Sequence, residues 1–221
     1  MPNFKAVIFD MDGTLIDSEL HWVDVANNFF RKRGLEYTKD IWAALAGKGM
    51  KETAGMIKNI CNLPESSEQV FTEIANDTNC IYTTKAQAMT GSNEIICKMK
   101  EVGLKQAIAS GSEIFRINKV MERLNWNKYF DHLISSEHVN GINKPDPAIY
   151  TYAAKVLNIN PKDCVVFEDS ENGVRSAKGA GMACIAVPDK RWSHGDFSMA
   201  DLIADSLLDE RIFHYIGINY V

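Results

Sequence analysis

Short apolar runs recur along the chain and predict the strands of a buried sheet. They cover residues 6–10, 106–110, 132–135, 164–168, 183–187 and 202–204. Several runs are continuous rather than alternating, which is typical of parallel strands covered on both faces. Between them, apolar residues recur at helical spacing over residues 112–124 and 146–157. Strands that alternate with helices predict an α/β protein, a Rossmann-like doubly wound parallel sheet.

The region from about residue 20 to about residue 89 carries no strand pattern. Val70, Ile74 and Thr78 lie on one helical stripe, and Val23 and Phe30 belong to another. Glycines and a Leu-Pro turn divide the region into about four helices. We therefore expect residues 17–88 to form an all-helical domain, inserted between the two parts, 1–16 and 89–221, of the sheet domain.

Helix boundaries are indicated at three positions of the sheet domain. Asp146 is expected to cap a helix that has Pro147 in its first turn. Ser170 is expected to cap the next helix, and Gly181 to end it. These residues place two helices directly after polar loops.

Charge and cysteine content limit the classes of partner and the compartment. The chain has 221 residues, with 24 Lys and Arg against 29 Asp and Glu, a net charge of −5. Nucleic acid and anionic membranes are not expected as partners, because both attract basic surfaces. Five cysteines without C-x-x-C spacing indicate neither a disulfide framework nor a zinc site, and Cys164 and Cys184 are expected to be buried thiols. With no secretory pattern at the start, we expect a cytoplasmic protein.

Polar side chains gather where the predicted strands end. They are Asp10, Asp12, Ser110, Gly111, Lys144, Glu168 and Asp169. The carboxyl ends of parallel strands meet at one edge of such a sheet, where ligands bind. Carboxylates crowded together repel unless a cation neutralises them, and oxygen ligands select a hard cation such as Mg²⁺. A lysine and a helix N-terminus beside that cation suit a phosphoryl group. Asp10 is then a candidate nucleophile, and Asp12 a candidate acid and base.

The spacing of these residues closely resembles the motifs of the haloacid dehalogenase superfamily, in its phosphatase and phosphomutase branch. The first motif is matched by residues 9–19, the second by Ser110, the third by residues 144–147, and the fourth by residues 168–170 with Asn172. The resemblance implies a Rossmann-like core with a helical cap inserted after the first motif.

The resemblance also implies roles for the matched residues. An aspartyl-phosphate would form on Asp10, with Asp12 as acid and base. Mg²⁺ would be held by the Asp10 carboxylate, the Asp12 backbone carbonyl and Asp169, with Glu168 adjacent. Ser110, Gly111 and Lys144 would hold the phosphoryl oxygens.

The substrate is expected to be a small phosphorylated metabolite, chosen by residues of the cap and the edge of the site. The candidates are Glu19, Lys48, Lys51 and Asn172. The run from Ser18 to Trp22 resembles sugar-phosphate phosphatases, and the loop at Lys48 resembles pseudouridine monophosphatases. Both readings make the chain a phosphatase of sugar phosphates or nucleoside monophosphates.

Three alternatives stay open at this point. A mutase of the β-phosphoglucomutase type needs a strong second phosphate site, typically with arginine, and the cap loop offers only Lys48 and Lys51. A dehalogenase is disfavoured by Asp12 and by the pair Glu168 and Asp169. A non-enzymatic phosphoacceptor signalling domain is disfavoured by the helical insertion. We expect a monomer, with a dimer contact through the stretch from residue 209 as the alternative.

Overall fold

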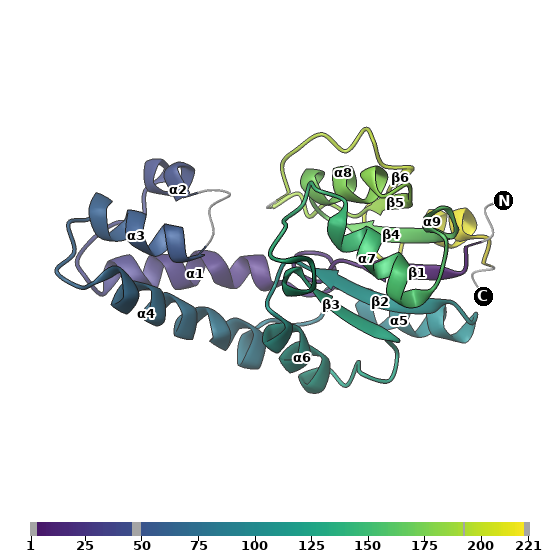
Figure 1. The fold of residues 1–221 in the computed structure, drawn as a ribbon, viewed down its shortest axis with the longest axis horizontal. Helices are drawn as coiled ribbons and strands as arrows, with labels where there is room; N and C mark the ends of the chain where they lie inside the picture. The colour runs from purple at the N-terminus through teal and green to yellow at the C-terminus, as the bar shows by residue number, and fades with distance from the viewer. Residues whose placement is uncertain (1–3, 46–49, 192, 219–221) are drawn as a thin grey trace. The chain divides into compact units, whose positions relative to one another are not determined.

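The computed structural model describes residues 4–45, 50–191 and 193–218. They form two compact units (Figure 1). One comprises the described residues up to Asp17 and from Gln87 onward, and the other runs from Ser18 to Ala86. The chain therefore leaves the first unit once and returns to it once.

The first unit is built on a six-stranded parallel sheet with the strand order β3-β2-β1-β4-β5-β6. Its strands are β1 (Ala6–Phe9), β2 (Lys105–Ser110), β3 (His132–Ser135), β4 (Cys164–Glu168), β5 (Ala183–Ala186) and β6 (Leu202–Ile203). All six predicted strands are present, and the α/β doubly wound fold is confirmed. The order reverses between β1 and β4, and this switch point is where open α/β sheets bind ligands.

Both faces of the sheet are covered, which explains the continuous apolar runs. Ala6 and Ile8 of β1 belong to a buried cluster with residues of α7 (Ala148–Leu157) and α8 (Glu171–Gly179). Their neighbours Val7 and Phe9 point to the opposite face and are equally buried, at 0% exposure. An apolar residue is therefore required at every position of this strand.

The first unit also contains the α-helices α5 (Ser92–Glu101), α6 (Ile114–Arg123) and α9 (Glu210–Ile216). Of these, α6 follows β2 and confirms the helix predicted over residues 112–124. The Ser170 hydroxyl caps α8 by accepting the Gly173 N–H at 3.0 Å, as predicted. The Asp146 carboxylate accepts the Ala148 N–H at 2.9 Å, although the residue at the helix boundary is Pro147. Gly181 has φ +76° just beyond the end of α8.

The two chain segments at the unit boundary pair with each other. The Asp17 N–H donates to the Gln87 carbonyl at 3.0 Å, and the Gln87 N–H donates to the Asp17 carboxylate at 2.6 Å. Ile16 and Ala88 form an antiparallel bridge beside them. Both crossing segments are thus tied to the first unit.

The described residues of the second unit form helices joined by turns, with no strand among them. It contains α1 (Ser18–Arg31), α2 (Lys39–Leu45), α3 (Met50–Ile60), α4 (Ser67–Cys80) and a π-helix (Ile81–Lys85). Its core includes Phe29, Phe30, Val70 and Ile74. The stripe predicted on α4 is confirmed, whereas Val23 of α1 is 37% exposed. Apolar residues surround much of α1, so the periodicity did not select the buried face.

An ion-pair network joins α1 to α4 and to the segment before it. The Arg33 guanidinium contacts Glu65 at 2.9 Å and Glu73 at 2.6 Å, and it lies 3.8 Å from the centre of the Phe29 ring. Bidentate contacts of this kind fix the geometry of both partners. The network therefore locks helices that are distant in sequence.

Three further features concern the cysteines, membrane-spanning helices and the short helix α9. All five cysteines are free, and Cys164 and Cys184 are buried as predicted. Across the part of the chain that the structure describes, no helix is both long and apolar enough to cross a bilayer. The short helix α9 buries Ile212, Phe213 and Ile216 in the first unit.

Candidate active site

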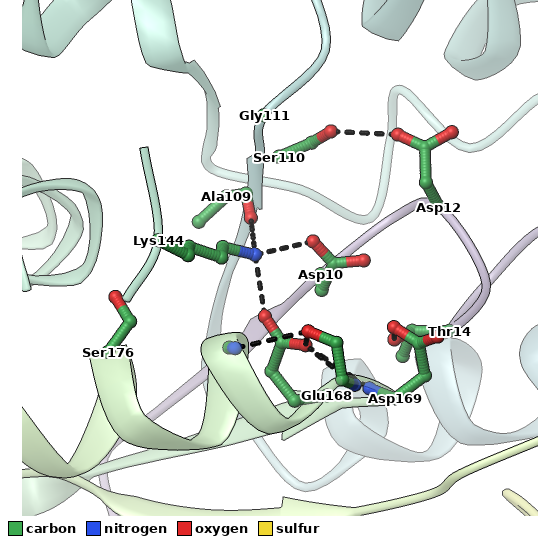
Figure 2. A network of polar contacts seen from close by, with 12 residues as sticks. Asp10, Asp12, Thr14, Ala109, Ser110, Gly111, Lys144, Glu168, Asp169 and Ser176 are labelled. Carbon is green, nitrogen blue, oxygen red and sulfur yellow. Dashed lines mark hydrogen bonds and ion pairs between the residues drawn. The ribbon is translucent and has the colours of Figure 1, made fainter. Parts of the chain in front are cut away.

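The polar residues predicted at the strand ends converge at the switch point of the sheet (Figure 2). Asp10 directly follows β1, and its N–H donates to the Phe167 carbonyl of β4 at 3.0 Å, which extends the strand ladder by one residue. Ser110 ends β2, and Glu168 ends β4. Parallel pairing in register brings these positions to the same edge.

Lys144 is the centre of the network. Its ammonium contacts Asp10 Oδ1 at 2.5 Å and Glu168 Oε1 at 2.6 Å, and donates to the Ala109 carbonyl at 3.2 Å. Burial alone would lower the pKa of Lys144, but Asp10 and Glu168 outweigh it and raise that pKa. The lysine therefore stays charged and carries a fixed positive charge beside Asp10.

Glu168 is saturated with donors. Its Oε1 accepts from Lys144 and, at 2.6 Å, from the Tyr150 hydroxyl. Its Oε2 accepts from the N–H groups of Asp169 and Ser170 and from the Ser170 hydroxyl, at 3.1 to 3.3 Å. Any side chain at Gly173 would overlap this carboxylate. Glu168 therefore orients Lys144 and its own loop in this structure.

Three buried carboxylates share the site with this single lysine. Oxygen atoms of Asp10, Glu168 and Asp169 lie within 4.8 Å of one another. Burial raises the pKa of Asp10 well above its usual value, and Glu168, Asp169 and Asp12 raise it further against the opposing effect of Lys144. Three carboxylates against one ammonium leave two negative charges in excess when all are ionised. An all-oxygen set with that excess fits a hard divalent cation.

Asp169 lies close to Gly13 in the turn after β1. Gly13 has φ +79°, and a side-chain carbon there would lie 2.5 Å from Asp169 Oδ2. The hydroxyls of Ser193 and Thr14 donate to the two oxygens of Asp169 at 3.0 and 3.5 Å. Glycine thus allows the turn after β1 to approach the carboxylate closely.

Asp12 is half-buried and turned toward the end of β2. Its Oδ2 accepts from the Ser110 hydroxyl at 3.0 Å and from the Ser112 hydroxyl at 2.8 Å. Its carboxylate is not part of the group that could share a cation. The expectation for Asp12 in metal binding concerned its backbone carbonyl, so the two roles do not compete.

The other predicted residues are exposed in the first unit or belong to the helical unit. Gly111 is exposed at the tip of the loop after β2, and Asn172 is exposed in the first turn of α8. Glu19 lies in the first turn of α1 and Lys51 is exposed on α3, both in the helical unit. Lys48 lies outside the described residues.

Sequence reasoning assigned no role to three groups that complete the site. Tyr150, Ser193 and Ser112 contact Glu168, Asp169 and Asp12, respectively. Tyr150 offered one signal, because a tyrosine within an apolar helix needs a partner for its buried hydroxyl. No local pattern marks Ser193, which comes from the long loop after β5.

Comparison with known proteins identifies the family. Residues 7–187 match the family described as haloacid dehalogenase-like hydrolase. A Thermotoga maritima protein named "Phosphorylated carbohydrates phosphatase" is 31% identical over 179 residues, which cover 80% of this chain and 82% of that protein. A Drosophila melanogaster protein named "Probable pseudouridine-5'-phosphatase" is 31% identical over 210 residues, 91% of this chain and 89% of that one.

A solved structure shares the fold over almost the whole chain. It is described as a "putative beta-phosphoglucomutase" from Thermotoga maritima, and it is 27% identical with a TM-score of 0.80. The match covers 97% of this chain and 99% of that chain. The names of the two sequence relatives are those of phosphatases, and the name of this structure is that of a mutase.

Proposed function

The chain belongs to the haloacid dehalogenase-like hydrolase family, and from that membership we propose that it is a Mg²⁺-dependent phosphatase of small phosphomonoesters that uses Asp10 as its nucleophile. The observation that carries the proposal is the buried network of Asp10, Lys144, Glu168 and Asp169 at the switch point of the sheet. There Asp10, the proposed nucleophile, lies beside the fixed charge of Lys144 and close to further carboxylates that could hold a metal ion.

The reaction has two displacement steps. In the first, an Asp10 carboxylate oxygen bonds to phosphorus, the ester P–O bond breaks, and Asp12 gives its proton to the leaving oxygen. In the second, Asp12 takes a proton from water as the water oxygen bonds to phosphorus. The bond from phosphorus to Asp10 then breaks, which releases inorganic phosphate and restores both aspartates.

The phosphoryl group is assigned to Ser110, Gly111 and Lys144. The Lys144 ammonium already lies against Asp10, so an oxygen on the phosphorus atom under attack would come within its reach. The Ser110 hydroxyl and the exposed Gly111 N–H lie at the end of the neighbouring strand. Fixed donors of this kind stabilise the charge that spreads over the equatorial oxygens in the transition state.

Mg²⁺ fits the two negative charges that Lys144 leaves uncompensated among the three carboxylates. Asp10 and Asp169 would hold it with the backbone carbonyl of Asp12, while Glu168, whose oxygens are occupied by donors, would support Lys144. A bound Mg²⁺ neutralises charge on the phosphoryl oxygens and on the attacking carboxylate.

For the substrate, we propose a sugar phosphate or a nucleoside monophosphate in the cytoplasm. The support is the identity above 30% with relatives named for phosphorylated carbohydrates and for pseudouridine 5'-phosphate. The helical unit, with Glu19, Lys48 and Lys51, would act as the cap that selects the leaving group, and Asn172 would line the edge. A monomer suffices for this chemistry, because one chain supplies every group.

A phosphosugar mutase is the second candidate, favoured by the likeness to the structure named as a β-phosphoglucomutase. A mutase must hold a second phosphate while it turns its intermediate around. The candidate cationic residues of the cap loop are Lys48 and Lys51, and a lysine lacks the bidentate geometry of arginine. Hydrolysis is therefore the reaction that we propose first.

The test is phosphate release from a panel of sugar phosphates and nucleoside monophosphates, with Mg²⁺ and with EDTA. Conversion of β-glucose 1-phosphate is assayed beside it. Release that needs Mg²⁺ supports the phosphatase and identifies its substrate class. Isomerisation without net release makes the protein a mutase, and inactivity in both assays contradicts both candidates.

A further inference from the structure

The carboxylate of Asp12 is held by two hydroxyls that come from one short loop. Ser110 Oγ and Ser112 Oγ donate to the same oxygen, Asp12 Oδ2, at 3.0 and 2.8 Å. Ser110 is also a residue assigned above to the phosphoryl group. One of the two bonds to Asp12 is therefore made by a group that the substrate needs.

Ser110 cannot serve both acceptors at once. A serine hydroxyl carries a single proton, and the Ser110 oxygen already accepts the Ser112 N–H at 2.9 Å. When that proton turns to a phosphoryl oxygen, Asp12 loses the bond from Ser110. Of the two hydroxyls, Ser112 alone then still donates to Asp12.

The loop that carries Ser112 is anchored from the neighbouring strand. The Ser135 hydroxyl donates to the Ser112 carbonyl at 2.8 Å, and the Ser136 hydroxyl donates to the Gly111 carbonyl at 2.9 Å. A side chain on a backbone held at consecutive carbonyls keeps its direction. The Ser112 hydroxyl is thus placed independently of Ser110.

A plain helix-capping role does not account for Ser112. Helix α6 begins at Ile114, and the residue at its N-terminal boundary is Glu113, whose side chain makes no capping hydrogen bond. The Ile114 N–H is instead accepted by Glu137 Oε2 at 3.3 Å. The proton of Ser112 goes to Asp12.

We propose that Ser112 is a positioning residue, which keeps the Asp12 carboxylate in place once the phosphoryl group has taken the hydroxyl of Ser110. The inference rests on the proposed function, because it assumes that Asp12 protonates the leaving oxygen. Ser112 itself touches neither phosphorus nor the leaving group. Its effect on catalysis passes through the hydrogen bond to Asp12.

The test compares two esters that differ in how much they need a proton on the leaving oxygen. p-Nitrophenolate leaves readily without one, whereas phenolate does not. In Ser112→Ala, kcat/KM is expected to fall roughly 10-fold for phenyl phosphate and about 2-fold or less for p-nitrophenyl phosphate, with the loss in kcat. Ser112→Thr, which keeps the hydroxyl, is expected to restore the phenyl phosphate rate.

Two controls separate positioning from damage to the loop. Ser136→Ala removes one anchor of the same loop and keeps the Ser112 hydroxyl, and its loss for phenyl phosphate is expected to be smaller than that of Ser112→Ala. In an Asp12→Ala background, Ser112→Ala is expected to change nothing further, because two residues that act through one group are not additive. Should Ser112→Ala fail to fold, Ser112→Cys, with a weak thiol donor, replaces it.

The outcomes distinguish this inference from the function it rests on. Unchanged rates in Ser112→Ala, equal losses for both esters, or a further loss in the Asp12→Ala background overturn the role of Ser112 and leave the phosphatase standing. A folded wild-type protein that releases phosphate from neither ester and from no member of the substrate panel contradicts the phosphatase and the positioning role together.

Discussion

Lys144 and Arg33 are each held between two carboxylates, and they differ in what surrounds them. Lys144 lies between Asp10 and Glu168, whose side chains are 9% and 1% exposed. Arg33 of the helical unit lies between Glu65 and Glu73, both 31% exposed. The first set has a further buried carboxylate, Asp169, within reach.

The surroundings shift the pKa of a carboxylate in opposite directions in the two sets. The hydrogen bond from Arg33 lowers the pKa of Glu73, so that its charged form is favoured. Burial raises the pKa of Asp10 despite Lys144, so that its charged form is held at a cost. A set whose carboxylate is favoured in its charged form stabilises a fold. The set of Asp10, Glu168 and Asp169 around Lys144, called the unbalanced set below, holds the charge of Asp10 at a cost and is poised to take up a cation or an electrophile.

The largest expected effect comes from removing the charge of Asp10, and the corresponding change at Glu73 in the Arg33 set serves as the control. Asp10→Asn is expected to lower kcat by roughly 10⁴-fold or more, because no other group can form the covalent intermediate. Glu73→Gln is the matched control, and we expect it to leave kcat within about 2-fold. Near-normal phosphate release by Asp10→Asn excludes Asp10 as the nucleophile.

The same variant has a predicted pH dependence of stability in EDTA. Because the pKa of Asp10 is raised in the folded state, the folded protein binds that proton more tightly than the unfolded chain. Its contribution to stability is present at low pH and is lost as pH rises through the folded pKa. Asp10→Asn is therefore expected to gain unfolding free energy over wild type at pH 7 and to gain less at pH 4, by urea denaturation.

Removing the two cations should separate function from stability. Without metal, Lys144→Met is expected to lose about 3–5 kcal/mol of unfolding free energy, since buried carboxylates remain unpaired. Mg²⁺ is expected to recover part of that loss but not the activity. Arg33→Met is expected to lose about 2 kcal/mol and to keep its kcat. Guanidinium denaturation and phosphate release measure both, and equal behaviour of the two variants contradicts the comparison.

Mg²⁺ should stabilise the wild-type protein through the unbalanced set. At about 100 times its Kd, a ligand that binds only the folded state adds about 2.7 kcal/mol, which corresponds to roughly 5–10 °C in Tm for a chain of this size. Asp169→Asn is expected to remove most of this shift, and Glu73→Gln none of it. A Tm that does not respond to Mg²⁺ in the wild type contradicts the assigned metal site.

The smallest effect compares two serine caps. Ser66 caps α4 by accepting the Gln69 N–H at 3.2 Å, and Ser170 caps α8 but also donates to Glu168. Each Ser→Ala change is expected to cost about 1 kcal/mol of unfolding free energy. Only Ser170→Ala is expected to lower kcat, by a few-fold, because it loosens the carboxylate that orients Lys144. A similar fall in kcat for Ser66→Ala contradicts this effect of Ser170 on catalysis.

Much of the fold follows from local patterns. The strands were predictable because a parallel sheet covered on both faces requires apolar residues at every position, as at Val7 and Ile8. The buried face of α4 was predictable from its stripe, but that of α1 was not, since Val23 is exposed and Val25 is buried. Where apolar residues surround a helix, packing against its neighbours selects the buried face.

For the candidate site, the residues near Asp10 were predictable, because the carboxyl ends of parallel strands meet at one edge of the sheet. The directions of their side chains were not. Only the tertiary structure shows Glu168 saturated by five donors, Ser193 reaching Asp169 across 24 residues, and Asp12 turned to Ser110 and Ser112. Spacing along a strand determines which residues can meet. Which hydrogen bonds they form depends on donors from segments that only folding brings within about 3 Å.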